Sequence, residues 1–155
     1  MELRLAIAAD LSNLAALYRD TVLINAPQHY TPAQTEAWAA VDGDSPRFRQ
    51  FIFGVTTYVA EDSTGIVGFA GIGDDGHVAS AYVRHDRLHQ GIGSTLMQAV
   101  LAHAQEKQMA RLYAEASEFS LGLFKKFGFH QYDTEVTNHN GVQFTRFLVE
   151  RSNPV

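Results

Sequence analysis

The sequence predicts a mixed α/β fold, in which a mostly antiparallel sheet of about seven strands is flanked by about four helices. Segments with the two-residue period of strands and segments with the helical period follow one another along most of the chain. Clusters of Gly, Asp and Asn separate neighbouring strand segments and indicate turns. The 155 residues are 46% hydrophobic, which supports one core, so residues 1–155 are expected to form a single domain.

The first third of the chain is predicted to contain one strand and several helical segments. Residues 3–7 alternate as a strand, and Asp10 is expected to cap the amphipathic helix that follows. Residues 24–54 depart from the smooth alternation of elements. Within them, the stretch 31–34 has the pattern of a capping box with proline at the first helical position, which predicts a short helix. A turn-rich stretch then precedes a helical turn at residues 48–51.

The middle of the chain is predicted to form a three-stranded meander. Residues 56–61 and 66–72 read as a hairpin, and a Gly-Asp-Asp-Gly turn leads into a strand at 77–83. Residues 112–129 lie between this meander and the end of the chain. Its final elements are a hairpin whose two strands cover 129–136 and 142–149.

A glycine-punctuated turn at residues 87–96 runs without a break into an amphipathic helix. Gly91 and Gly93 allow the main chain to approach a ligand closely, and the first amides of the helix point outward at the positive end of its dipole. One stripe of the helix is apolar, formed by Ile92, Leu96, Met97, Val100, Leu101 and Ala104. The order strand, loop, helix therefore predicts a site for an anionic phosphate group.

Two common nucleotide-binding motifs fit this loop poorly. The dinucleotide fingerprint G-x-G-x-x-G requires a third glycine where the chain has Leu96, and the Gly-Lys-Ser/Thr ending of a P-loop does not occur. A module that binds ATP or NAD is therefore the less favoured reading of the loop.

The segment from Tyr82 to Leu96 resembles motif A of the GNAT superfamily, the Gcn5-related N-acetyltransferases. Residues 112–117 and 123–129 are similar to the fifth strand and fourth helix of that family, in the required order, so the resemblance covers nearly the whole chain. It implies a sheet splayed between strands four and five, with acetyl-CoA as cosubstrate. A shorter similarity at residues 29–34 points to the bacterial YafP-like subgroup.

The resemblance also implies which residues contact acetyl-CoA. The main-chain amide of Val83 would bind the acetyl carbonyl and stabilise the oxyanion that forms there. The other expected cofactor contacts are His85, His89, Gln90, Gly91, Ile92, Gly93, Ser94, Thr95, Ser117 and Phe124. Ser117 replaces an asparagine of the family, and it is equally a candidate N-cap for the next helix.

Two positions depart from the family pattern. Leu88 replaces a Gln or Arg, although Arg87 and His89 flank it. Phe124 replaces the tyrosine that often protonates the departing thiolate. Its helical spacing indicates core packing, so the proton would have to come from water or from another group.

Glu115 is the leading candidate to accept the proton of an incoming amine. It lies near the end of the predicted strand at 112–117, and the alternative is a structural carboxylate that pairs with an arginine. Tyr82 points away from the face of Val83 and is a candidate either for the acceptor pocket or for the core. The expected acceptor-binding residues are His29, Tyr30 and Trp38, with His139 in a bordering segment.

Composition narrows the remaining classes of function. The absence of cysteine excludes a disulfide framework, a thiolate zinc site and a cysteine nucleophile. A net charge of -5 with scattered basic residues argues against a nucleic-acid partner. The seven histidines lack metal-binding spacing, so no metal is expected. No apolar run approaches membrane-spanning length and no signal peptide is apparent, so we expect a cytoplasmic protein without a membrane partner.

These observations predict an acetyl-CoA-dependent N-acetyltransferase that acts on the amine of a small molecule by direct attack in a ternary complex. A homodimer is compatible with that prediction. The alternative from another class is an acyl-CoA-binding or sensing protein with little catalytic activity, which the departures at Leu88 and Phe124 favour.

Overall fold

The computed structural model describes residues 1–153. Its strands are β1 (Glu2–Leu5), β2 (Thr56–Asp62), β3 (Gly65–Ile72), β4 (Val78–Val83), β5 (Arg111–Ala116), β6 (His130–His139) and β7 (Val142–Ser152). Its α-helices are α1 (Leu11–Asn25), α2 (Pro32–Ala39), α3 (Pro46–Phe53), α4 (Ile92–Glu106) and α5 (Leu121–Lys126), with 3-10 turns η1 (Ala8–Asp10), η2 (Ala26–Gln28) and η3 (His85–Arg87). The predicted fold class is confirmed, and α3 is a full helix where the sequence indicated only a turn.

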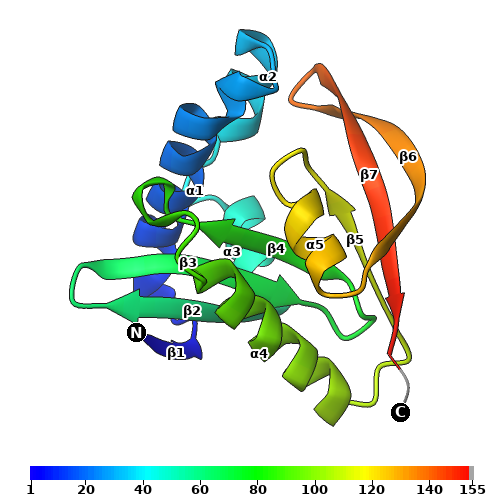
Figure 1. Ribbon diagram of the computed structural model, residues 1–155. Helices are drawn as coiled ribbons and strands as arrows, with labels where there is room; N and C mark the ends of the chain where they lie inside the picture. Colours follow the sequence, from blue (N-terminus) through cyan, green and yellow to red (C-terminus); the bar gives the residue numbers. More distant parts are fainter. Residues whose placement is uncertain (154–155) are drawn as a thin grey trace.

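The seven strands are divided between two antiparallel sheets (Figure 1). One sheet has the order β1-β2-β3-β4, and the other has the order β5-β7-β6. Within residues 1–153 the ladders join the two sheets only through a parallel bridge between His77 and Tyr113. From that bridge β4 and β5 diverge, so the splay lies where the family resemblance implied.

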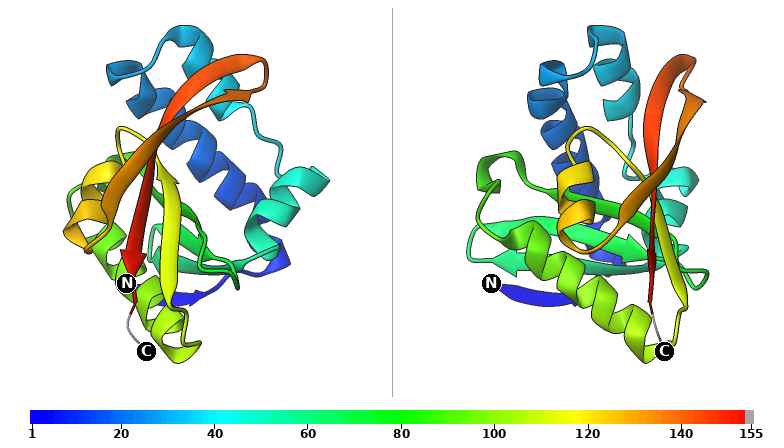
Figure 2. Two further views of the ribbon diagram at one scale, coloured as in Figure 1. Left: turned by 90° about the vertical axis from the view of Figure 1, so that its right-hand side faces the viewer. Right: turned by 45° about the vertical axis from the view of Figure 1, so that its right-hand side comes forward.

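Helices cover both faces of the four-stranded sheet (Figure 2). On one face α4 buries a core that includes Leu96 and Val100. On the other face α1 and α3 pack against β3, and Leu14, Ile52 and Phe69 are buried there. The two cores hold β4 between them, which fixes the strand from which the site is built.

Asp10 does not cap α1, contrary to the sequence prediction. Its side chain makes no cap hydrogen bond to the helix. Its carboxylate instead accepts hydrogen bonds from both terminal nitrogens of Arg4, at 2.8 and 2.9 Å, and from the amide of Ile7 at 2.8 Å. The residue is 6% exposed, so its charge is better satisfied by the fixed fork of a guanidinium than by helix amides.

The predicted capping box of α2 is confirmed. The Thr31 hydroxyl accepts from the Gln34 amide at 3.1 Å, and the Gln34 side chain accepts from the Thr31 amide at 3.0 Å. In α3 the Ser45 hydroxyl accepts from the Phe48 amide, which explains why this segment extends beyond one turn. Both caps position helices that border the cavity described below.

Candidate active site

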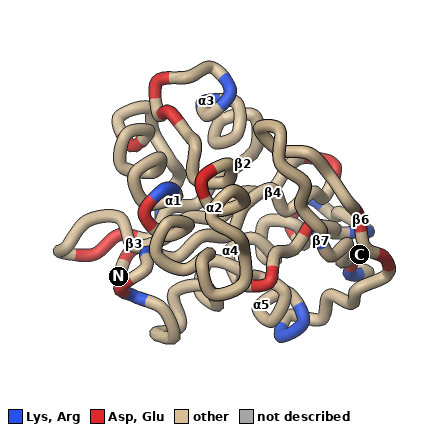
Figure 3. The backbone as a smooth tube through the Cα atoms, turned by 90° about the horizontal axis from the view of Figure 1, so that it is seen from above, with Lys and Arg blue, Asp and Glu red and all other residues tan. Residues whose placement is uncertain are grey.

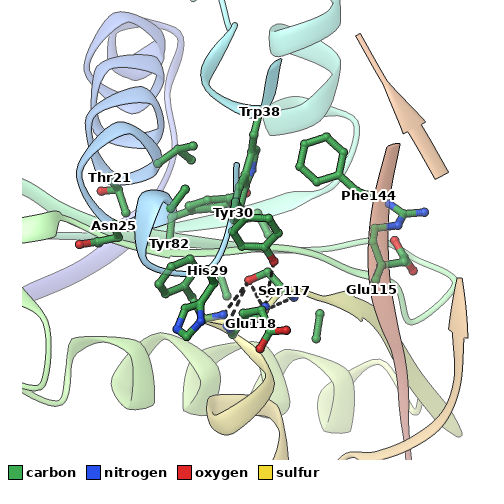
Figure 4. Close-up of a pocket in the computed structure, with 18 of the residues that line it drawn as sticks. Thr21, Asn25, His29, Tyr30, Trp38, Tyr82, Glu115, Ser117, Glu118 and Phe144 are labelled. Carbon is green, nitrogen blue, oxygen red and sulfur yellow. Dashed lines mark hydrogen bonds between the residues drawn. The ribbon is translucent and has the colours of Figure 1, made fainter. Parts of the chain in front are cut away.

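A cavity of about 780 Å³ lies where β4 and β5 diverge (Figure 4). Its walls come from α1, η2 and α2 on one side and from β4, the β5–α5 connection and the β6–β7 hairpin on the others. Side chains from the two sheets and from the N-terminal helices therefore converge on one space. A cavity of this size accommodates a small molecule together with part of a larger one.

The loop before α4 has the geometry of an anion site. Gly91 adopts φ 83° and His89 adopts φ 61°, so the chain turns sharply before the helix begins at Ile92. The amide of Thr95 is the first to bond within the helix, to the Gly91 carbonyl at 3.0 Å. The amides of the preceding first turn are consequently available to a ligand at the positive end of the dipole.

Two side-chain hydroxyls at this loop make hydrogen bonds within the protein. The Thr95 hydroxyl donates back to the Gly91 carbonyl at 2.9 Å, so its proton is already engaged. The Ser94 hydroxyl accepts from the ammonium of Lys126 at 2.7 Å. Sequence reasoning did not identify Lys126, which lies on α5, since only tertiary packing brings that helix beside α4.

The main chain of Val83 faces the cavity. The Arg84 amide donates to the Val67 carbonyl at 2.8 Å, and Val83 lies opposite Gly68 in the same ladder. Hydrogen-bonded pairs alternate in an antiparallel ladder, so the amide and carbonyl of Val83 point away from β3. The Thr21 hydroxyl, which also lines the cavity, donates to that carbonyl at 3.2 Å.

Glu115 lines the cavity and bonds to His77, with 2.8 Å between Oε1 and Nε2. The His77 ring stacks on Tyr113 at 4.9 Å, and the Tyr113 hydroxyl donates to Asp75 at 2.6 Å. The hydrogen bond from His77 is the main cause that lowers the pKa of Glu115, with a smaller contribution from the charge of Arg146. The same bond raises the pKa of His77. Glu115 is therefore ionised at neutral pH.

An aromatic group lines the side of the cavity on which the sequence predicts the acceptor (Figure 4). Tyr30 packs against Trp38 at 5.2 Å, and both rings contact Phe119 and Phe144. The Tyr30 hydroxyl accepts from the Glu118 amide at 3.0 Å, which links the α1–α2 connection to the β5–α5 connection. The expected pocket residues from residues 24–54 are thus brought together with rings from the C-terminal half.

Tyr82 belongs both to the cavity wall and to the core. Its ring stacks on Phe69 at 5.3 Å, and its hydroxyl accepts from Trp38 Nε1 at 3.3 Å. Burial raises the pKa of Tyr82. The two alternatives raised by the sequence are therefore compatible for this residue.

Ser117 caps the turn that leads into α5. Its hydroxyl accepts from the amides of Phe119 and Ser120, each at 3.2 Å, and the residue also lines the cavity. Phe124 is 3% exposed and packs against Phe129 at 5.0 Å, while part of it reaches the cavity wall. Both residues combine a structural role with access to the site.

Most of the predicted site residues meet at this cavity. Those in its lining are His29, Tyr30, Trp38, Tyr82, Val83, His89, Glu115, Ser117, Phe124 and His139. His85 and the loop residues 90–95 are outside the lining, but a Cβ on Gly93 would lie 3.5 Å from Val83 Cγ2, so the loop adjoins it. Lining residues that the sequence did not single out include Arg47, Phe144 and Arg146. The spacing of these residues along the chain carries no signal for their convergence.

Comparison with known proteins identifies related sequences. A family model described as acetyltransferase (GNAT) domain matches residues 27–150. The chain is 25% identical over 140 residues to the uncharacterized N-acetyltransferase YafP of Escherichia coli (strain K12), covering 90% of this chain and 88% of that protein. It is 32% identical over 143 residues to an L-methionine sulfoximine/L-methionine sulfone acetyltransferase of Pseudomonas aeruginosa, covering 82% and 78%.

Solved structures have the same fold. A GCN5-related N-acetyltransferase from Rhodopseudomonas palustris superposes with a TM-score of 0.91 at 26% identity, covering 97% of this chain and 94% of that one. The PaiA N-acetyltransferase from Thermoplasma acidophilum, solved in complex with coenzyme A, has a TM-score of 0.79 at 17% identity, covering 97% and 98%.

Proposed function

The chain belongs to the GNAT acetyltransferase family, and we propose that it transfers an acetyl group from acetyl-CoA to the amine of a small molecule. The observation that carries this proposal is the divergence of β4 and β5, which leaves the main chain of Val83 facing a cavity that adjoins the loop before α4. The relative that acetylates L-methionine sulfoximine and L-methionine sulfone supports a small acceptor. We further propose direct attack in a ternary complex, without a covalent enzyme intermediate.

The residues present fit acetyl-CoA, which supplies an acetyl thioester. The amides that precede Thr95 would hold its pyrophosphate, with Gly91 allowing close approach because a Cβ there meets no atom within 4 Å. Ser117 and Phe124 would border the pantetheine arm. The Val83 amide would polarise the acetyl carbonyl, a contribution of roughly 3 kcal/mol for one oxyanion donor.

The acceptor amine would enter between Tyr30, Trp38 and Phe144, beside Tyr82. Glu115 would accept a proton from the incoming ammonium group, because its carboxylate is ionised and faces the cavity. The lowered pKa of Glu115 makes it a relay that passes this proton on to water, not a group that retains it.

A protein that binds acyl-CoA with little catalysis is the second candidate. Phe124 favours it, because its buried ring offers no phenolic proton to a leaving thiolate. In that case acetyl-CoA would bind in the same cavity, and no amine would accelerate thiol release.

A thermal-shift titration followed by a thiol-release assay tests the proposal. Acetyl-CoA at about 100 times its Kd should add about 2.7 kcal/mol of stability, or roughly 5–10 °C in Tm. ATP and NAD should have no effect. Failure of acetyl-CoA and CoA to stabilise the protein would contradict the cofactor site. Stabilisation without thiol release in any amine panel would favour the binding protein.

A further inference from the structure

Arg47 brings a positive charge to the cavity. Within residues 1–153 this charge neither stabilises helix α3 nor forms an ion pair. It is the second residue of α3, directly after Pro46, and it lines the cavity. A positive charge in the first turn of a helix opposes the helix dipole. Among residues 1–153 no hydrogen bond or ion pair holds its guanidinium, whereas the other arginine of the lining, Arg146, pairs with Glu135.

The surroundings of Arg47 favour an anion. His139 Nε2 is buried without a hydrogen-bond partner, and its residue lines the same cavity. Burial lowers the pKa of His139, and the charges of Arg47 and Arg146 lower it further, which favours the neutral imidazole. A neutral His139 retains one N–H, which can be carried by Nε2. An exposed positive charge and a buried imidazole without a partner therefore line the same cavity.

The phosphates of the cosubstrate are not expected to bind beside Arg47. Their expected site is the N-terminus of α4, which covers one face of the four-stranded sheet, whereas α3 packs on the opposite face (Figure 1). Figure 3 shows Lys and Arg positions on α3, separate from those beside α5. The anion that Arg47 would bind must belong to another molecule.

The aromatic group connects His139 to the proposed acceptor side of the cavity. Phe144 lies 6.2 Å from the ring of His139 and also contacts Tyr30 and Trp38. The carboxylate of Glu115 provides the opposite charge in the same cavity. Such a site is suited to a molecule that carries both an ammonium and an anionic group.

We propose that the acceptor is a carboxylate-bearing amine of amino-acid type, and that Arg47 binds its carboxylate. This inference rests on the proposed acetyltransferase function and names its substrate class. The amine of the same molecule would be directed to the side of Glu115 and Val83.

Paired acceptors test the inference in thiol-release kinetics. Each of several L-amino acids, with L-methionine sulfone among them, is compared with the amine that lacks only the carboxylate. The wild type should prefer the amino acid of the best pair by roughly 10- to 100-fold in kcat/KM, mainly through KM. Arg47→Gln should remove that preference, because KM for the amino acid should rise to a value close to that for the plain amine.

Arg49→Gln is the matched control, because Arg49 lies on the same helix and is exposed, but does not line the cavity. It should retain the preference, and stabilisation by acetyl-CoA should be the same in all three proteins. A wild type that uses both members of every pair equally, or an Arg47→Gln variant that loses both equally, would overturn the inference. Absence of thiol release with every amine would instead count against the acetyltransferase function itself.

Discussion

At the residue scale, the pair formed by Glu115 and His77 gives the cavity its ionised carboxylate. Glu115 projects from β5, and His77 lies just before β4, at the point where the two sheets meet. Stacking on Tyr113 and the hydrogen bond from Tyr113 to Asp75 hold the imidazole in place. The position of the carboxylate is therefore set by a chain of contacts across the bridge.

Glu115→Gln removes the charge and keeps the size of the side chain. We expect kcat to fall about 100-fold, because a general base contributes on that order, while the Tm shift caused by acetyl-CoA stays unchanged. The control is Glu118→Gln, which changes another carboxylate of the lining. Unaltered turnover at saturating acceptor would remove Glu115 from the mechanism.

The same pair should make stability depend on pH in a defined direction. The pKa of His77 is raised above its ordinary 6.5, so its contribution is complete below that pH and is lost as the pH rises through the folded-state pKa. The pKa of Glu115 is lowered below its ordinary 4.5, so its contribution is complete above that pH and is lost as the pH falls through the folded-state value. The pair is therefore strongest between those two ordinary values.

His77→Gln should lower Tm most within this window. We expect a loss of about 2–4 °C near pH 5–6, because a partly exposed pair contributes about 1 kcal/mol, and a smaller loss near pH 9. Melting curves at several pH values measure it, with His130→Gln as the control because His130 has a longer contact of 3.5 Å to Glu150. A pH-independent difference would show that His77 acts through packing alone.

At the element scale, α4 and α5 together would form the proposed phosphate site. The positive φ of Gly91 suits glycine, so Gly91→Val would strain the turn even without a ligand and cannot isolate a clash with pyrophosphate. Lys126 provides a better probe, because its ammonium reaches Ser94 from the neighbouring helix. Its charge adds to that of the dipole at the N-terminus of α4.

Lys126→Met should weaken acetyl-CoA binding by roughly 5- to 10-fold, with greater loss at low ionic strength. Calorimetric titration at two salt concentrations measures this effect. Lys125→Met is the matched control, since Lys125 is adjacent and exposed but makes no contact with Ser94. Equal Kd values for the two variants would place the cofactor phosphates elsewhere.

At the scale of the whole molecule, contacts between distant parts of the chain connect the elements around the cavity. Asn140, at the tip of the β6–β7 hairpin, donates to the Ala37 carbonyl of α2 at 2.9 Å. The Gln34 side chain donates to the Gln143 carbonyl at 3.0 Å. These hydrogen bonds join the N-terminal helices to the three-stranded sheet beside the proposed acceptor pocket.

Asn140→Gly should loosen this connection without straining the hairpin, because Asn140 adopts φ 49°, which glycine accepts. We expect the acceptor KM to rise about 2- to 5-fold, the equivalent of one neutral hydrogen bond, while the affinity for acetyl-CoA is unchanged. Steady-state kinetics with the best amine measures it. An unchanged KM would mean that the hairpin does not shape the acceptor pocket.

No helix among residues 1–153 is both long and apolar enough to cross a membrane. The hydrophobic residues are used instead in two cores, one on each face of the four-stranded sheet. This division follows from β4, where Val83 faces the α4 core and Tyr82 faces the core of α1 and α3. One strand therefore presents side chains to both cores and its main chain to the cavity.

Much of the fold follows from local sequence. The period of the apolar residues identified the strands and α4, the pattern at 31–34 identified α2, and Gly91 marked the start of α4. These features depend on contacts within a few residues, so the sequence alone was sufficient for them. The order of these elements was determined in this way, whereas the place of the splay was implied by the resemblance to the GNAT superfamily.

The site depended on tertiary structure wherever a residue meets a partner far along the chain. Glu115 pairs with His77 and not with an arginine, Lys126 reaches Ser94, and Asp10 binds Arg4 instead of capping α1. Arg47 joins the cavity from α3, a helix that the sequence indicated only as a turn. Such encounters depend on how the two sheets and the helices pack, and hydrophobic periodicity specifies which face of an element is buried but not which side chain it will meet.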